Sequence, residues 1–174
     1  SFCKMTEIKI AQGAKQTGGK LSGHKVTPAI AYYRNVEAYK DLFSPNRFPY
    51  ASTIEELFDF IGELQKLSKK PVGIKIVISD NQNIEPYAKE IRRRLDLGMD
   101  SYPDFITLDS GSGGSATAPL EMMERVGLNI KDSVYLVDKI LRDYNIRDKI
   151  RIVAAGKILT PDDIIIIKSL GADF

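Results

Sequence analysis

Four short apolar segments rich in β-branched residues, separated by helical patterns, constrain the fold of this chain most strongly. They lie at residues 6–11, 72–78, 105–108 and 150–154, and each is followed by glycine or small polar residues. Strands that are apolar on both faces are typical of parallel sheets that lie buried between other layers. The alternation of such strands with helices therefore predicts an α/β fold with parallel strands.

The helical patterns between these strands have recognisable starts. Thr27-Pro28 and Thr160-Pro161 each combine an N-cap residue with proline at the first helical position. A capping box at residues 52–55 predicts a helix that runs to about Lys69. Two further helices are predicted over 86–95 and 131–144. The apolar stripe of the helix that ends near Lys69 consists of Leu57, Phe58, Ile61, Leu64 and Leu67.

Either a doubly wound sheet or a (β/α)8 barrel fits this order, although a closed barrel typically needs about 250 residues. The connection over 12–50 holds one clear helix and is too long for an idle loop, so we expect it to have a function. The chain opens with Ser1 and stops just after a predicted helix. We expect residues 1–174 to be a single β/α segment that is truncated at both ends.

Composition narrows the possible classes of function. The 25 lysines and arginines against 23 acids leave a net charge of +2, which gives no electrostatic case for nucleic acid or an anionic membrane as partner. No apolar run approaches the roughly 20 residues of a membrane span. The single cysteine, Cys3, excludes an internal disulfide, and we expect neither a metal site nor reactivity from it. We expect a cytoplasmic protein.

Candidate functional residues follow the strands, because active sites of parallel α/β folds lie at the carboxyl ends of the strands. Lys9 and Lys75 each lie within an apolar strand, where a buried lysine must pair with an anion or lose its charge. We expect both ammonium groups on the same, inner side of the sheet. Gln12 and Lys15 follow the first strand among glycines.

Two glycine-containing loops follow the third and fourth strands. The loop at 110–119 combines three glycines with hydroxyl residues, a composition that forms backbone N–H cradles for phosphate. Plain linkers have the same composition, so this signal alone leaves both interpretations open. The pair Gly156-Lys157 precedes a capped helix, which again favours an anion.

These motifs, taken in order, resemble the FMN-binding domain of glutamate synthase and its stand-alone archaeal and bacterial relatives. The most specific part is EIKIAQGAK at 7–15, followed by HKVTP at 24–28. The similarity continues through 73–75, 109–120 and 155–157 and covers essentially the whole chain. The chain departs from the family pattern at 13–19, which is one residue shorter and has no proline, and at Ala116, which replaces a loop glycine.

The resemblance implies that the chain forms about half of a TIM (β/α)8 barrel that holds FMN beside a 3Fe-4S cluster. The cysteine ligands of that cluster are absent from this chain. The implied reaction is the reductive amination of 2-oxoglutarate to glutamate, with nitrogen from glutamine or ammonia. The implied partners are an electron donor protein or reductase subunit and the remaining barrel segments.

The resemblance also implies roles for individual residues. Lys15 would polarise the imino acid, and Lys9, Gln12 and Lys15 would lie around the flavin and the keto acid. Arg34 would pair with a substrate carboxylate, and Lys75 would lie against the flavin ring. The ribityl and phosphate side of the flavin would be flanked by Ser110, Gly111, Gly113, Gly114, Ser115, Gly156 and Lys157.

A second hypothesis remains open, in which the chain is a non-catalytic half-barrel that binds no flavin. A 2-hydroxy-acid oxidase lacks support, because the single histidine, His24, is not at a strand end. The electron donor, the nitrogen source and the oligomeric state are not predicted. A partial barrel would also leave the inward faces of its strands partly exposed, and we expect this of Ile8, Ile10, Ile74, Ile76, Ile106 and Ile152.

Overall fold

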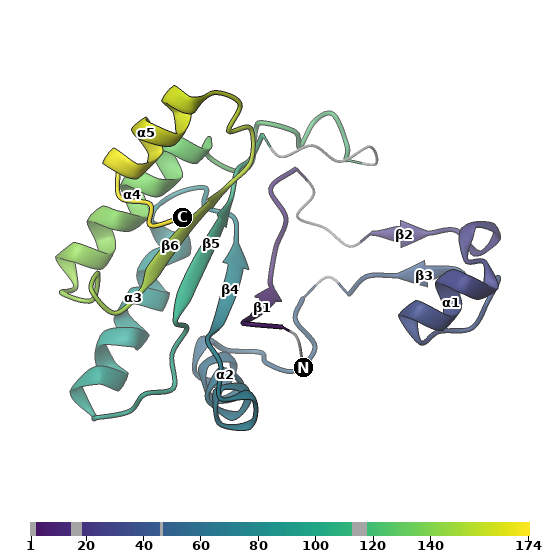
Figure 1. The fold of residues 1–174 in the computed structure, drawn as a ribbon, viewed down its shortest axis with the longest axis horizontal. Coiled ribbons are helices and arrows are strands. Elements are labelled where there is room, and N and C mark those ends of the chain that lie inside the picture. The colour runs from purple at the N-terminus through teal and green to yellow at the C-terminus, as the bar shows by residue number, and fades with distance from the viewer. Residues whose placement is uncertain (1–2, 15–18, 46, 113–117) are drawn as a thin grey trace. The chain divides into compact units, whose positions relative to one another are not determined.

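The computed structural model describes residues 3–14, 19–45, 47–112 and 118–174, and the chain forms two compact units (Figure 1). The larger unit comprises Ser1–Gln16 and Tyr50–Phe174, and the smaller unit is Thr17–Pro49. The long connection noted in the sequence is thus a compact unit of its own.

The larger unit contains a four-stranded parallel sheet. Its strands are β1 (Thr6–Lys9), β4 (Val72–Ile76), β5 (Phe105–Asp109) and β6 (Arg151–Ala155), in the order β1-β4-β5-β6. All four predicted strands are confirmed to within two residues at each end. Strands that are neighbours in the sheet are also successive within this unit, which favours winding in one direction over a doubly wound sheet.

Four helices of this unit lie on one face of the sheet (Figure 1). They are α2 (Ile54–Ser68), α3 (Asn81–Asp96), α4 (Ile130–Asp143) and α5 (Pro161–Ser169). Helix α2 packs on β4, and α4 packs on β5 and β6. The predicted inward side chains of α4 are buried, namely Val134, Val137, Ile140 and Leu141.

Two helix starts differ from the sequence prediction. Thr53 rather than Ser52 caps α2, because the Thr53 hydroxyl accepts a hydrogen bond from the Glu56 N–H. The Glu56 carboxylate in turn accepts one from the Ser52 N–H. Leu67, expected on the buried stripe, is 82% exposed in the last turn. Helix α3 begins at Asn81, five residues before the predicted start, because Asp80 and Asn83 form a capping box. Pro86 therefore lies inside the helix and not at its start.

The two faces of the sheet differ in character. Side chains alternate along a strand, so one row of the register faces the helices and the next row faces away. The row that faces the helices contains Ile8, Ile74, Ile106 and Ile152, all buried. The expectation of lost burial was wrong for these four isoleucines and for Ile76, which is also buried, whereas Ile10 is half-buried. Lys9 and Lys75 occupy the next row and therefore share the open face, as expected.

The smaller unit contains the predicted helix and a two-stranded antiparallel sheet. Helix α1 (Pro28–Arg34) starts at the predicted Thr27-Pro28, after a short 3-10 helix η1 (Gly23–Lys25). The antiparallel pairing of β2 (Lys20–Leu21) with β3 (Leu42–Phe43) was not predicted, because each strand has only two residues. In the described parts of both units, no helix has the length and apolar character that a membrane span requires.

Candidate functional site

Two lysines lie side by side where β1 and β4 end. Lys9 and Lys75 are register partners on these adjacent strands. The Lys9 ammonium donates to the Gln12 side-chain oxygen at 2.9 Å, and the Lys75 ammonium lies 3.5 Å from Asp109 Oδ1. Like charges directly opposite one another are destabilising in a sheet unless anions compensate them. The structure thus brings together three predicted residues, Lys9, Gln12 and Lys75, in a cationic group suited to an anionic ligand.

Asp109 is a functional candidate that the sequence analysis did not single out. It ends β5, its side chain is 10% exposed, and its second carboxylate oxygen accepts from the Gly13 N–H at 2.7 Å. An acid at the carboxyl end of a parallel strand, beside a lysine on the next strand, is the signal that points to it.

Glycines let the loops after β1, β5 and β6 approach each other closely. A Cβ on Gly13 would lie 1.8 Å from the Ser110 carbonyl oxygen. Gly156 has a φ of +113°, and a Cβ there would lie 2.7 Å from the Ser110 Cβ. Side chains at these two positions would therefore separate the three loops, and the positive φ at Gly156 favours glycine in its own right.

The backbone N–H groups of the two predicted phosphate loops differ in availability. The Ser110 N–H donates to the Ala155 carbonyl and the Gly111 N–H to the Leu128 carbonyl, both at 2.9 Å. The N–H groups of Gly156 and Lys157 donate to no other residue that the structure describes. These two N–H groups are therefore available donors for an anion. Lys15, Gly113, Gly114 and Ser115 lie outside the described residues.

Lys157 is held by a partner from the preceding loop. Its ammonium pairs with the Glu124 carboxylate, and this ammonium holds the pKa of Glu124 below its ordinary value. Both residues have left-handed backbones, with φ of +43° and +62°. Non-glycine residues in this region carry strain, which tends to persist at functional sites. The Glu124 N–H also donates to the Gly111 carbonyl, so this pair joins the two predicted phosphate loops.

Arg34 belongs to the smaller unit. It lines a pocket there, together with the apolar side chains of Val36, Leu42 and Phe43. Lys20 and Asp41 also line it and pair with each other at 2.6 Å. The Arg34 guanidinium beside this ion pair is suited to a small carboxylate. All the residues that line this pocket belong to the smaller unit.

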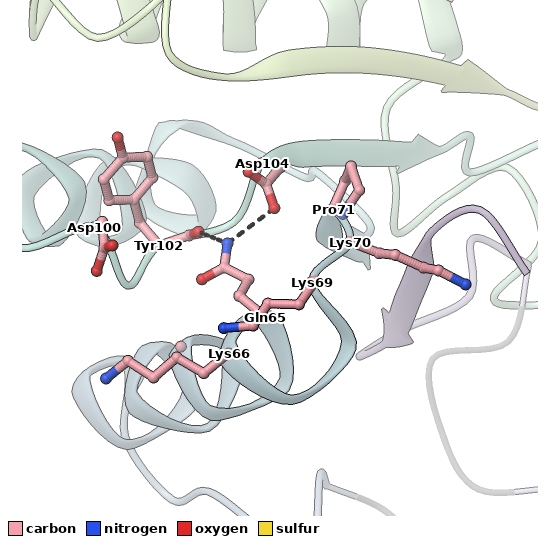
Figure 2. Close-up of a pocket in the computed structure, with 9 residues that line it drawn as sticks. Gln65, Lys66, Lys69, Lys70, Pro71, Asp100, Tyr102 and Asp104 are labelled. Atoms are coloured by element: carbon pink, nitrogen blue, oxygen red, sulfur yellow. Dashed lines mark hydrogen bonds between the residues drawn. The ribbon is translucent and has the colours of Figure 1, made fainter. Parts of the chain in front are cut away.

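A second pocket lies near the amino ends of β4 and β5 (Figure 2). The Gln65 amide donates to the Tyr102 carbonyl at 2.9 Å and to an Asp104 carboxylate oxygen at 2.8 Å. The same Asp104 oxygen accepts from the Val72 N–H at 2.7 Å. These bonds hold the start of β5 against β4 and the end of α2, which is a structural role.

The described residues offer no cluster of three or more histidine, cysteine, aspartate and glutamate side chains for a metal ion. Cys3 is exposed. These residues therefore do not fit the ligand set of an iron–sulfur cluster, which thiolates hold.

Comparison with known proteins places the chain in a family. A family model described as a conserved region in glutamate synthase matches residues 2–174. The chain belongs to the glutamate synthase family. This confirms the resemblance drawn from the motifs, and it makes this chain a relative of oxidoreductases.

Three relatives show how much of a longer protein the chain represents. It is 40% identical over 171 residues to the glutamate synthase large subunit-like protein YerD of Bacillus subtilis. It is 36% identical over 170 residues to an archaeal-type glutamate synthase [NADPH] of Thermotoga neapolitana, and 33% identical over 171 residues to an archaeal glutamate synthase [NADPH] of Methanocaldococcus jannaschii. These matches cover 96–98% of the chain and 32% of each relative. The chain thus spans about a third of the length of these relatives.

Proposed function

We propose that this chain is part of an FMN-dependent oxidoreductase of the glutamate synthase type, which reductively aminates 2-oxoglutarate to glutamate. The observation that carries the proposal is the lysine pair, Lys9 and Lys75, on the open face of the sheet at the carboxyl ends of β1 and β4. Both the keto acid and a reduced flavin are anions, so paired cations at this position favour their binding. Family membership supports the same reaction.

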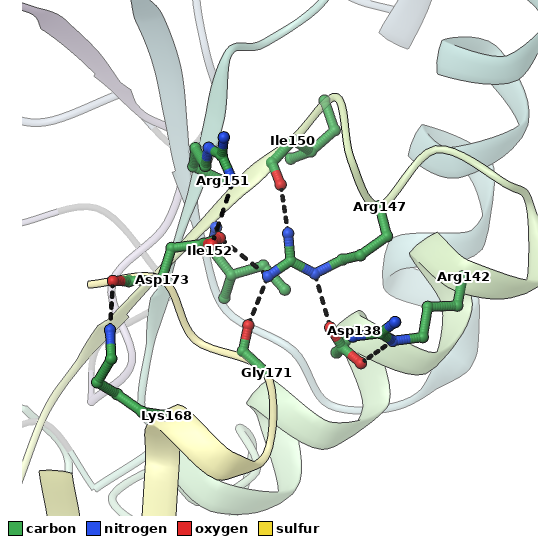
Figure 3. Close-up of polar contacts among 9 residues, drawn as sticks. All are labelled: Asp138, Arg142, Arg147, Ile150, Arg151, Ile152, Lys168, Gly171 and Asp173. Carbon is green, nitrogen blue, oxygen red and sulfur yellow. Dashed lines mark hydrogen bonds and ion pairs between the residues drawn. The ribbon is translucent and has the colours of Figure 1, made fainter. Parts of the chain in front are cut away.

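A TIM barrel is the fold that we propose for the domain to which this chain belongs, with the chain forming about half of that barrel. The support is a repeated arrangement at two strand starts. Asp104 and Val72 exchange two hydrogen bonds, from the Asp104 N–H to the Val72 carbonyl and from the Val72 N–H to the Asp104 carboxylate. Asp173 and Ile152 exchange the same two bonds, each at 2.8 Å (Figure 3).

The repetition extends to the residue that follows. Asp104 leads directly into Phe105, the first residue of β5, and Asp173 is likewise followed by phenylalanine. Arg147 reinforces the second arrangement, since it donates to the Asp173 carboxylate at 2.9 Å and the Gly171 carbonyl at 2.6 Å (Figure 3). We therefore propose that Asp173 and Phe174 lie where a further parallel strand pairs with β6, as in a barrel.

The donors present in the larger unit fit FMN. The Gly156 and Lys157 N–H groups would hold the phosphate, and Lys75 would lie against the ring. Bound FMN would supply the hydride that reduces the imino acid. Lys9 and Gln12 would orient the keto acid, Lys15 would polarise the imino acid, and Arg34 would bind a carboxylate.

The nitrogen source and electron donor of the reaction are proposed by class. We propose glutamine or ammonia as the nitrogen source. The names of two relatives contain an electron donor. The name of the Thermotoga protein contains NADPH, and that of a Pyropia yezoensis glutamate synthase, 28% identical over 172 residues, contains ferredoxin. A donor protein or reductase subunit of one of these classes is the partner that we propose.

Flavin titration of the full-length protein tests the proposed site. Lys75→Met and Gly156→Val should each weaken FMN binding at least tenfold, which corresponds to about 1.4 kcal/mol. Lys89→Met is the matched control, because this exposed lysine pairs with Glu85 on the surface of α3. Unchanged affinity in both site variants would contradict the proposed site. A wild-type protein that binds no FMN would instead favour the half-barrel that binds no flavin.

Lys15→Met separates catalysis from flavin binding. We expect it to abolish the amination of 2-oxoglutarate while the bound flavin keeps its absorbance spectrum, because the proposed role of Lys15 is electrophilic. A variant with undiminished turnover would remove Lys15 from the mechanism.

A further inference from the structure

Asp109 connects three strand ends through its two carboxylate oxygens. Oδ2 accepts from the N–H of Gly13, which follows β1, and Oδ1 faces the Lys75 ammonium of β4 at 3.5 Å. Asp109 itself ends β5. The side chains of Asp109 and Lys75 are only 10% and 23% exposed, so water screens their attraction less than it would at the surface.

The Asp109 carboxylate accepts its hydrogen bond from Gly13 in a closely packed region. The hydrogen bond between Gly13 and Asp109 is buried, and the Gly13 Cα lies so near the Ser110 carbonyl that no side chain fits between them. Without Asp109, the Gly13 N–H would be a buried donor without its acceptor, which is costly. Lys75 would lose the carboxylate that lies beside it.

We propose that Asp109 is a positioning residue with two separate tasks. One oxygen fixes the backbone at Gly13, and the other holds the Lys75 ammonium on the open face of the sheet. The consequence for flavin chemistry rests on the proposed function, whereas the two contacts themselves do not.

The two tasks can be separated by substitution. Asn at position 109 keeps an oxygen that can accept from the Gly13 N–H, but it removes the negative charge beside Lys75. Ala removes both. Asp104→Asn is the matched control, because Asp104 precedes the same strand at its other end and also accepts a backbone N–H.

The first experiment uses the full-length protein without flavin. Hydrogen exchange of the Gly13 amide should accelerate at least tenfold in Asp109→Ala and less than threefold in Asp109→Asn. Acylation of Lys75 by an amine-reactive reagent, followed by mass spectrometry, should accelerate at least threefold in both variants. Asp104→Asn should leave both rates at wild-type values.

Either of two results would overturn the proposal. One is wild-type exchange at Gly13 in Asp109→Ala, and the other is wild-type acylation of Lys75 in Asp109→Asn. If Asp109→Ala does not fold, the acylation of Lys75 in Asp109→Asn still decides the second task, and tenfold faster Gly13 exchange in Asp109→Asn would contradict the first.

A second experiment connects the proposal to the flavin. In the full-length protein with FMN, Asp109→Asn should raise the flavin midpoint potential, because an anion is removed beside the proposed ring site, and Asp104→Asn should not. An unchanged potential would refute the link between Asp109 and the flavin. A wild-type protein that takes up no FMN would instead refute the proposed function, while exchange and acylation would still decide the positioning role.

Discussion

Arg94 shows how a single buried charge organises the larger unit. It is 1% exposed, yet its guanidinium donates to Glu90 at 2.7 Å, to the Ser101 hydroxyl at 2.7 Å and to the Glu55 carbonyl at 2.8 Å. It also lies 5.4 Å from the centre of the Phe58 ring. One side chain therefore joins α2, α3 and the connection that leads to β5.

Replacing Arg94 should weaken α3 strongly. Arg94→Met leaves Glu90 with Arg93 as its remaining arginine partner and removes the donor to the Ser101 and Glu55 carbonyls. Removing one member of a buried pair costs about 3 kcal/mol. Hydrogen exchange of α3 peptides in the full-length protein should accelerate by roughly two orders of magnitude. Arg92→Met is the control, because Arg92 pairs with the exposed Asp96 and such surface pairs contribute about 0–1 kcal/mol. Equal effects of the two substitutions would contradict this account of Arg94.

At the scale of elements, the start of α3 shows a limit of the sequence prediction. Pro86 suggested a first helical position, whereas the helix begins at Asn81. The Asp80 side chain accepts from the Gln82 N–H at 2.8 Å, and the Asn83 side chain accepts from the Asp80 N–H at 3.2 Å. Two reciprocal local bonds outweigh the preference of one proline for the first turn.

The cap of α3 gives a prediction at this scale. Asp80→Ala should lower the free energy of unfolding by about 1 kcal/mol. Hydrogen exchange over residues 81–90 should accelerate accordingly, whereas Asp96→Ala at the other end of the helix should change it little. A null effect of Asp80→Ala would show that packing alone determines the start of α3.

How far the site could be predicted depends on the range of the contacts that form it. The strands and the shared face of Lys9 and Lys75 follow from local patterns, because alternation along parallel strands fixes which side chains share a face. The occupied N–H groups of Ser110 and Gly111 could not be predicted, because their acceptors belong to β6 and to residue 128. The role of Asp109 depends on Gly13, which lies 96 residues away in the chain.

Asp173 makes the stability of the larger unit depend on pH. Burial raises the pKa of its carboxyl, but the Ile152 N–H and Arg147 together outweigh burial and hold the pKa below the ordinary 3.8. Since the folded pKa is the lower one, this stabilisation is present above about pH 4 and is lost as the pH falls through the folded value. The free energy of unfolding of the full-length protein, measured in urea, should therefore fall less steeply below pH 4 in Asp173→Asn than in wild type. If both proteins lost the same free energy of unfolding below pH 4, the role of Asp173 would be contradicted.

At the scale of the whole molecule, apolar side chains around α5 are left uncovered. Ile164, Ile165 and Ile166 are 52%, 64% and 42% exposed, and Leu159 and Phe174 are exposed as well. Isolated exposed apolar residues are ordinary, but a group of this kind favours association with another apolar surface.

Residues 1–174 expressed alone should therefore self-associate. Sedimentation velocity should show species larger than the 19.4 kDa monomer, and Ile165→Lys should shift the distribution toward monomer. Tyr32→Lys, at an exposed position of α1, is the control for added charge. A wild-type chain that sediments as a monomer would contradict this prediction.

The central claim is that the lysine pair of β1 and β4 serves flavin-dependent amination of 2-oxoglutarate. In the most direct test, the full-length protein is reduced anaerobically and then mixed with 2-oxoglutarate, with ammonium, or with both. The flavin absorbance is followed after mixing. The account predicts flavin in the purified protein and reoxidation only with both compounds, with one glutamate formed per flavin. Absence of flavin, or a reduced flavin that both compounds together leave unchanged, would contradict the account.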